Sequence, residues 1–317
     1  MKKSGFFLLA ILFIECSGTS SDSQIVDPAT DSVFEATTPL GVAVKKILGI
    51  TADDKHEMLK WRLTLNKDPK KLAPTTFTLT YEYGIPKQGT RGFMDGSKKV
   101  QLTGNWVIEK GTPANKATTI ITVTSSGMPV SLSFLQADEN ILHLLDDAKN
   151  LMVGNGAWSY TLNRKDPVPQ KKFITGDILA SQVLAANDTI GVFEGRTPCY
   201  TGLTNINDIS SNGCQLVKCQ LILLPSVDTH NPADFILKTV YVGKGDNKYT
   251  ITGKWKMLQR TASDPTAIIY QLEPDSVKSS TPLLLLRGDD SILFFTDPDG
   301  RLLVGNDYCS YTLNKVR

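Results

Sequence analysis

The chain has few of the residues and patterns that mark the more easily recognised classes of protein. Its 317 residues include only three histidines and six methionines, which argues against a histidine-rich or methionine-rich metal store. Its 34 basic and 32 acidic residues nearly balance, so it lacks the basic surface by which proteins hold nucleic acid. No apolar run reaches the roughly 20 residues that a mature membrane-spanning helix needs. What is present is an ordinary globular composition, 41% hydrophobic and 21% charged. The length suggests about two domains.

The N-terminus has the pattern of a bacterial export signal. A cationic start, Met1-Lys2-Lys3, is followed by an apolar segment over residues 5–14. Cys16 comes close behind that segment and precedes small residues, which is typical of lipoprotein signals whose cysteine becomes the lipidated first residue. Ordinary cleavage after Gly18 or Ser20 and a buried N-terminal helix are the alternatives.

We therefore predict a signal over residues 1–16, lipidation at Cys16, and a flexible polar tether over residues 17–39. This arrangement anchors the protein in the bacterial cell envelope, at the outer membrane. A periplasmic or secreted protein is the alternative.

Three short motifs occur twice in the chain, about 150 residues apart. The pairs are Leu102–Trp106 with Ile251–Trp255, Leu151–Asn155 with Leu302–Asn306, and Ser159–Asn163 with Ser310–Asn314. Such self-similarity indicates two copies of one domain. We place them at residues 40–164 and 188–317, joined by a linker over 165–187 that includes a short helix near 175–186.

The pattern within each copy predicts β structure. Trp61–Leu65 and Phe77–Tyr81 both alternate between apolar and polar residues. Short strands separated by turn residues favour a barrel or a sandwich, and about eight per copy suffice to close an up-and-down, lipocalin-like barrel. The strands expected in copy two are Gly191–Gly195, Cys219–Leu224, Phe235–Val242, Tyr249–Leu258, Ala267–Leu272, Pro282–Arg287, Ile292–Thr296 and Cys309–Leu313.

Copy two also resembles a known family. It opens with a Gly-x-x-x-Gly-x-x-Pro-Cys pattern over Gly191–Cys199, continues to a Gly-x-Trp, and ends in Tyr-Thr-Leu. In these features it resembles the N-terminal domain of the NlpE family of copper-resistance and envelope-stress lipoproteins. The resemblance implies a small lipocalin-like barrel on an envelope lipoprotein. The family's Cys-x-x-Cys is absent, so copper chemistry does not transfer.

The four cysteines beyond Cys16 all lie in copy two, and they allow three pairings. Aligning the copies places Trp61 opposite Cys219 and Trp158 opposite Cys309, which suggests that these two positions touch. We therefore expect a Cys219–Cys309 disulfide in copy two and a Trp61–Trp158 contact in copy one. The remaining pair is Cys199–Cys214. A zinc or copper thiolate site is the alternative, but the cysteine spacing does not suit zinc.

The chain contains no nucleophile elbow, phosphate loop or His-Glu-x-x-His motif. His143 has the place of an ordinary strand residue, and His56 is expected to be exposed. The acidic pairs at 146–147 and 289–290, and the acidic residues at 297–300, are expected in turns. Accordingly, we predict no catalytic residue, no metal site and no cofactor.

Two tryptophans, Trp106 and Trp255, follow a glycine inside a strand in both copies. A core aromatic at a bulge is one interpretation, and stacking on a ligand is the other.

These observations predict a non-enzymatic lipoprotein of two barrels with a role in interaction or envelope-stress sensing. Its partners would be the membrane, through the N-terminal lipid, and another envelope protein. The alternative is a carrier that holds a small apolar ligand inside a barrel; an unrecognised enzyme is a third class. Packed barrel interiors favour the first function, whereas an open apolar cavity favours the carrier.

Overall fold

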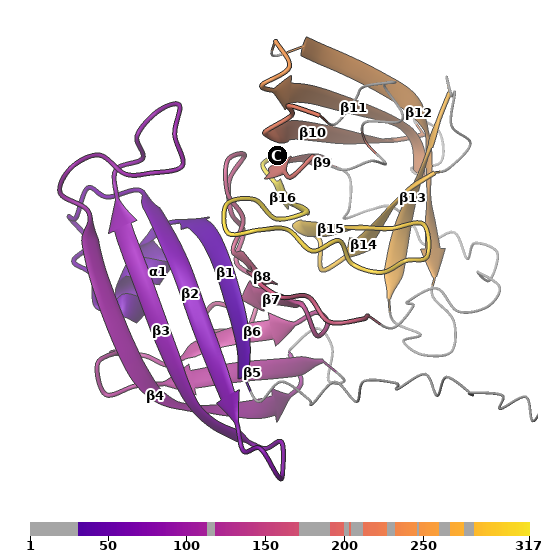
Figure 1. Ribbon diagram of the computed structural model, residues 1–317. Coiled ribbons are helices and arrows are strands. Elements are labelled where there is room, and N and C mark those ends of the chain that lie inside the picture. Colours follow the sequence, from indigo (N-terminus) through magenta and orange to yellow (C-terminus); the bar gives the residue numbers. More distant parts are fainter. Residues whose placement is uncertain are drawn as a thin grey trace, which may run out of the picture.

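The computed structural model describes residues 31–112, 118–170, 191–199, 203, 212–226, 232–245, 247–259, 267–275 and 282–317. Within these residues the chain forms two closed antiparallel barrels of eight strands each, which confirms the expected tandem architecture. Barrel one contains β1 to β8 and barrel two contains β9 to β16 (Figure 1). The helix expected near 175–186, the predicted signal and Cys16 all lie outside the described residues.

In barrel one the strands and the single helix follow in chain order. They are β1 (Asp31–Pro39), α1 (Val42–Leu48), β2 (Met58–Lys67), β3 (Pro74–Gly84), β4 (Lys98–Lys110), β5 (Thr119–Thr124), β6 (Leu132–Gln136), β7 (Ile141–Leu144) and β8 (Thr161–Arg164). Barrel two comprises β9 (Gly191–Thr197), β10 (Leu216–Pro225), β11 (Pro232–Val242), β12 (Asn247–Gln259), β13 (Ile268–Pro274), β14 (Leu283–Arg287), β15 (Ile292–Thr296) and β16 (Thr312–Lys315).

Each barrel encloses a core built from the inward face of every strand. In barrel one this face includes Leu63, Phe77 and Leu79, all fully buried. In barrel two, Phe235 and Tyr270 are equally inaccessible. Because period-two alternation puts one side of each strand inside, the sequence pattern is sufficient to fill both interiors with apolar side chains.

The two copies match strand for strand. Trp106 on β4 pairs with Val123 on β5, and Trp255 on β12 pairs with Leu272 on β13. The carbonyl of Tyr160 accepts a hydrogen bond from the strand before it, and so does that of Tyr311. The repeat found in the sequence is therefore a repeat of the fold.

The predicted tether ends too late. Residues 31–39 form β1, which pairs with β2 over its whole length and closes the barrel against β8. Its buried positions include Ser32, Ala36 and Thr38 as well as Phe34. Small and polar residues on the inward face conceal the alternation that identifies a strand.

The sequence analysis also missed α1. This helix lies between β1 and β2 and buries Val44, Ile47 and Leu48 in the core of barrel one. It ends at Gly49, whose left-handed conformation (φ 69°) lets the chain turn out of the helix. A helix of two turns gives too short a periodic pattern to stand out in a sequence.

The barrels meet across an approximate two-fold axis. The hydroxyls of Ser159 and Ser310 share a hydrogen bond of 2.6 Å, and those of Thr161 and Thr312 share one of 2.9 Å. The two residues of each pair are 151 positions apart in the chain. His143 on β7 packs edge-on against Phe294 on β15, which has the same offset. Each of these residues therefore contacts its own counterpart in the other copy.

Two buried asparagines make the contact reciprocal. Asn163 accepts a hydrogen bond from the Gly305 backbone N–H (2.8 Å), and Asn314 accepts one from the Gly154 N–H (2.8 Å). The side-chain amides donate in turn to backbone carbonyls of the opposite barrel. A Cβ on either glycine would lie 2.9 Å from the asparagine oxygen and closer still to backbone, so both positions require glycine.

Candidate functional site: the cleft between the barrels

The two tryptophans considered for ligand stacking lie in the barrel cores. Trp106 and Trp255 are both 3% exposed, and each indole N–H donates to a backbone carbonyl at the end of the β2 or β10 strand, that of Asn66 or Leu224. Trp255 also packs on Tyr270 with ring centres 5.2 Å apart. The environment of both rings is that of core residues.

Barrel one has a small cavity at its mouth. The cavity measures about 80 Å³ and touches Phe34, Trp106 and Ile121. Pockets for drug-sized ligands usually measure about 300–1,000 Å³. This cavity is therefore too small for such a ligand.

The four cysteines that the structure describes form one disulfide. Cys199 and Cys214 form a disulfide with their Cα atoms 6.2 Å apart, as expected. The second expected bridge is not formed: Cys219 and Cys309 are separate buried thiols. The strand β9 runs between β10 and β16 and separates the two segments that carry them.

Both free thiols are held in the protonated form. Burial raises the pKa of Cys219 to about 12, and the neighbouring Cys309 adds to the shift while the Thr197 hydroxyl opposes it. Burial likewise raises the pKa of Cys309 to about 12, against the opposing charges of Arg196 and Arg91. Because the thiolate is the reactive species, these cysteines are chemically quiet at neutral pH.

The two tryptophans equivalent to these cysteines have different surroundings. Trp61 donates to the Thr38 hydroxyl at 2.7 Å and packs against Tyr81 inside barrel one. Trp158 lies outside the barrel, beneath the Arg196 guanidinium. The predicted pairing of Trp61 with Trp158 is replaced by these two separate contacts.

The remaining polar candidates have structural roles. His143 is completely buried between Thr161 and the Met152 carbonyl, and burial lowers its pKa to about 4. The acidic residues at the turns accept backbone hydrogen bonds, as Asp146 and Asp289 both do. Within the described ranges no three His, Cys, Asp or Glu side chains are grouped so that they could hold a metal ion.

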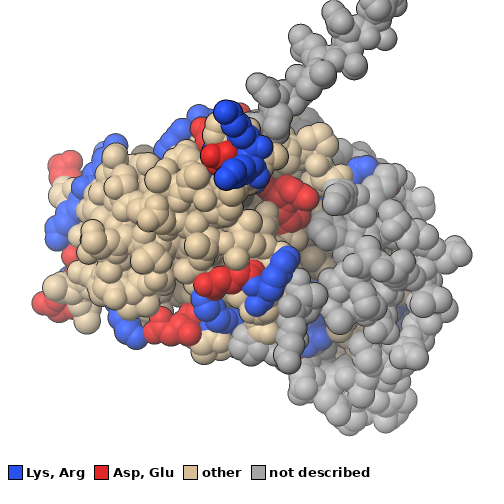
Figure 2. Space-filling view, turned by 90° about the horizontal axis from the view of Figure 1, so that it is seen from below, with Lys and Arg blue, Asp and Glu red and all other residues tan. Residues whose placement is uncertain are grey.

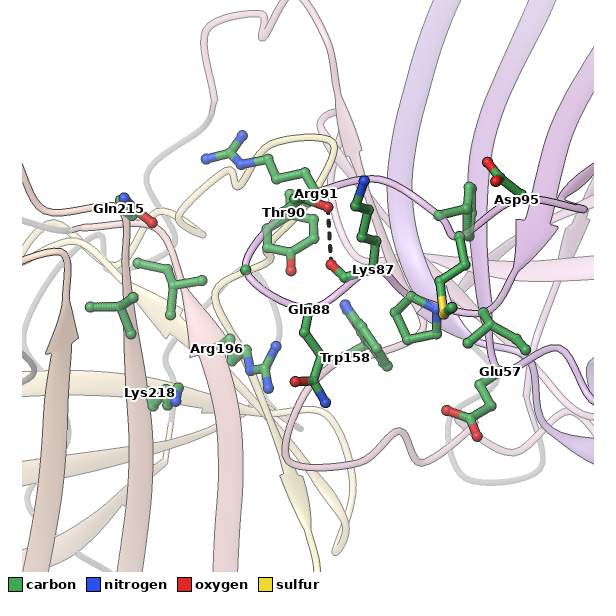
Figure 3. Close-up of a pocket in the computed structure, with 18 residues that line it drawn as sticks. Glu57, Lys87, Gln88, Thr90, Arg91, Asp95, Trp158, Arg196, Gln215 and Lys218 are labelled. Atoms are coloured by element: carbon green, nitrogen blue, oxygen red, sulfur yellow. Dashed lines mark hydrogen bonds between the residues drawn. The ribbon is translucent and has the colours of Figure 1, made fainter.

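The described residues line a cleft of about 1190 Å³ between the barrels (Figure 3). Barrel one supplies the loop between β3 and β4, residues 85–97, together with Trp158. Barrel two supplies Arg196 on β9, Lys218 on β10 and Tyr308 before β16. The cleft is thus made by both copies and does not exist in either alone.

Aromatic rings and arginines alternate in this cleft. The Arg196 guanidinium carbon lies 5.7 Å from the centre of the Trp158 ring, and that of Arg91 lies 5.1 Å from the Tyr308 ring. Arg91 also has a distant carboxylate, Asp307, at 3.9 Å. Each stack holds a planar cation against an aromatic ring.

The cleft breaks the two-fold symmetry of the molecule. Thirteen residues join β3 to β4 in barrel one, whereas four residues, 243–246, join the equivalent strands of barrel two. The longer loop is ordered by a bridge between Pro86 and Phe93 and by a turn at Thr90. Its extra length carries Arg91 across to Tyr308 of the second barrel.

Sequence analysis missed the residues of this cleft. The signal that was available is the offset between the copies, which falls from 158 residues at Trp61 and Cys219 to 149 residues at Trp106 and Trp255. An insertion in one copy of a tandem repeat commonly maps to a binding face.

The chain matches no family model, no curated protein and no solved structure. Among the helical residues that the structure describes, none forms a helix long and apolar enough to cross a membrane.

Proposed function

We propose that the protein is a non-enzymatic lipoprotein of the bacterial envelope, held to the membrane through Cys16, that binds another envelope protein in the cleft. An interaction or stress-sensing role of this kind is what the resemblance to NlpE-like lipoproteins implies. The observation that carries the proposal is a cleft of about 1190 Å³ that both barrels line, whereas the interior of barrel one is packed.

A surface view supports a localised site. On the face of barrel one in Figure 2, Lys and Arg stand beside Asp and Glu around a broad uncharged area. Mixed charge of this kind gives no long-range field of one sign. Arg196 and Lys218 in the cleft differ from that face, because among the described residues neither has a carboxylate within ion-pair distance.

Site-specific photo-crosslinking in producing cells tests the proposal. A photoreactive residue at Gln88, in the cleft, is expected to yield a crosslinked envelope protein, whereas one at exposed Gln101 on β4 is not. Replacement of Cys16 by serine should move the protein from the membrane fraction to the soluble fraction. Equal crosslinking at both positions, or none at Gln88, would count against the cleft.

The carrier function gives a different result. A carrier would bind an apolar fluorescent probe within a barrel, and the binding would survive substitutions in the cleft. Tight binding of such a probe, with no protein crosslinked at Gln88, would replace the interaction proposal with the carrier.

A further inference from the structure

We infer that the cleft binds an acidic peptide segment of the partner, with its carboxylates on Arg196 and Lys218 and its apolar side chains toward the β3–β4 loop. This inference rests on the proposed function and names the chemistry of the partner.

The first observation is an uncompensated pair of cations. Arg196 and Lys218 face each other directly across β9 and β10. Like charges at directly opposed positions of a sheet repel each other and destabilise the pair. Among the described residues neither side chain has a carboxylate partner. A bound anion would remove this repulsion.

The equivalent place in barrel one has no such pair. There the opposed residues are Thr37 and Lys60, and the Thr37 hydroxyl donates to the Asp307 carbonyl. Symmetry of the fold therefore does not require two cations at this position. The second cation, Arg196, is therefore found in barrel two alone.

The second observation is a set of unsatisfied donors. The Nε of Arg196 and the indole Nε1 of Trp158 are buried, and within the described part of the chain neither has a hydrogen-bond acceptor. Buried donors without acceptors are unfavourable, and nearly all such groups in folded proteins are paired. Both donors belong to the same stacked pair, where an acceptor would be favourable. Because both atoms are buried, a ligand oxygen reaches them only when the two side chains shift.

The third observation is the division of the cleft into two ends. Figure 3 shows Arg196 and Lys218 on the barrel-two side, and Glu57, Lys87, Arg91 and Asp95 on the barrel-one side, so the charged groups that barrel two contributes are cations alone. Ile85 and Met94 of the β3–β4 loop, at 42% and 53% exposed, also line the cleft. A ligand that fits has anionic groups at one end and apolar groups along its body.

Size selects among anionic ligands. The volume of about 1190 Å³ exceeds the usual range for small-molecule pockets, about 300–1,000 Å³. A single inorganic anion would leave most of the cleft and its apolar wall unused. An extended peptide with acidic and apolar side chains uses both.

Fluorescence anisotropy with the purified full chain tests the inference. The probe is a short fluorescein-labelled peptide of alternating glutamate and leucine, and its control is the same peptide with glutamine in place of glutamate. The acidic peptide should bind and the glutamine peptide should not. Binding should weaken as salt is raised, because the contacts are ionic.

Variants locate the binding site. K218Q should lower the affinity for the acidic peptide by roughly tenfold, because it removes one hydrogen-bonded charge. R196Q should lower this affinity by at least as much. K238Q removes an equally exposed lysine from β11, on the outer face of barrel two and outside the cleft, and should leave affinity unchanged. Lys218 is exposed and has no packing role, so K218Q keeps the test valid even where R196Q perturbs folding.

Four outcomes would overturn the inference. Equal binding of the acidic and glutamine peptides would remove the role of charge. Displacement of the peptide by millimolar inorganic phosphate alone would indicate a small-anion site, and binding of phosphatidylglycerol vesicles that K218Q abolishes would indicate a membrane surface. Crosslinking of an envelope protein at Gln88 without acidic-peptide binding would sink this inference and leave the proposed function standing, whereas loss of both would remove the two together.

Discussion

The two barrels share one fold but close one of their ends by different means. A buried threonine stands at the end of the first strand in each copy, Thr38 in β1 and Thr197 in β9. In barrel one Thr38 accepts a hydrogen bond from the large Trp61 ring, whereas in barrel two the small Cys219 thiol lies beside Thr197. The volume that one copy fills with an indole is therefore left to other groups in the second copy.

A covalent bond appears in the copy with the smaller side chain. In both copies this threonine is followed by a proline. The next residue is Leu40, which is buried, in barrel one, and Cys199 in barrel two. Cys199 is bonded to Cys214, which ties the segment to the start of β10. Barrel one depends on packing at this end, and barrel two adds a covalent constraint there.

The largest expected effect tests whether the cores are equivalent. Trp106→Ala and Trp255→Ala should each destabilise its own barrel by about 3–5 kcal/mol, because each removes a buried ring. Each also leaves a backbone carbonyl without its indole donor. Urea unfolding measures the loss of stability in both variants, and hydrogen exchange assigns that loss to one barrel. A large loss in one copy and a small one in the other would break the equivalence.

Removal of the disulfide should affect one barrel alone. Replacing Cys199 and Cys214 by serine frees a loop with a sequence separation of 15. On the chain-entropy account this costs about 3 kcal/mol. Urea unfolding should therefore show barrel two destabilised and barrel one unchanged.

The free cysteines provide the control for that experiment. A chain with Cys219 and Cys309 both replaced by alanine should keep the same sensitivity to reductant as the natural chain. If that sensitivity falls in the alanine variant, then the oxidised protein contains a second bridge that the structure does not.

The free energy of unfolding should depend on pH through His143, whereas its counterpart Phe294 cannot contribute because it does not titrate. Burial lowers the folded-state pKa of His143 to about 4, against about 6.5 when unfolded. The unfolded chain then binds the proton more tightly, so stability is full above pH 6.5 and is lost as the pH falls toward 4. His143→Phe should abolish this loss, which amounts to about 3 kcal/mol over the window.

The measurement is the difference between the natural chain and the variant in urea unfolding at several pH values. The carboxyl of Asp138 has a pKa raised to about 6 by burial, and it acts in the opposite direction. Because it is present in both chains, its contribution cancels from the difference. A pH-independent difference would show that the pKa of His143 is the same in the folded and the unfolded chain, and therefore that the side chain is not buried in solution.

The smallest effect tests the reciprocity of the interface. Asn163→Ala and Asn314→Ala each remove one buried side chain that bridges the barrels, and each leaves a glycine N–H unpaired. We expect about 1–3 kcal/mol from either substitution, and nearly the same value from both. Unfolding of the barrels should become less coupled, seen as two separated transitions. Unequal losses would show that the two halves of the interface do not contribute alike.

Much of the fold could be predicted because the repeat preserves the residues that shape it. The glycine before each core tryptophan, Gly104 or Gly253, has a neighbouring backbone oxygen within about 2 Å of where a Cβ would lie, so it is retained in both copies. The polar residues of the Ser-Tyr-Thr-Leu-Asn motif are also retained. Their identity in both copies was a signal for the interface, because ordinary outward strand positions need not be preserved.

The cleft could not be predicted in the same way. Its residues come from one copy each, and the repeat therefore gives no second example of Arg196, Trp158 or Arg91. It also depends on how the two barrels are placed, which no local pattern specifies. The Cys219–Cys309 prediction failed for a related reason, since an exchange of two residues between the copies does not reveal that β9 runs between the two segments that carry them.

The contacts between equivalent residues on the two-fold axis have an evolutionary consequence. A surface on which serine meets the same serine, and threonine the same threonine, is the surface by which two identical single-barrel chains associate as a symmetric dimer. Duplication and fusion of such a gene places both partners in one polypeptide and makes their association independent of concentration. Residues off the axis are then released from having to suit two positions at once. An inserted loop on one side and a new pair of cations on the other become separately heritable changes, which a homodimer could not have acquired.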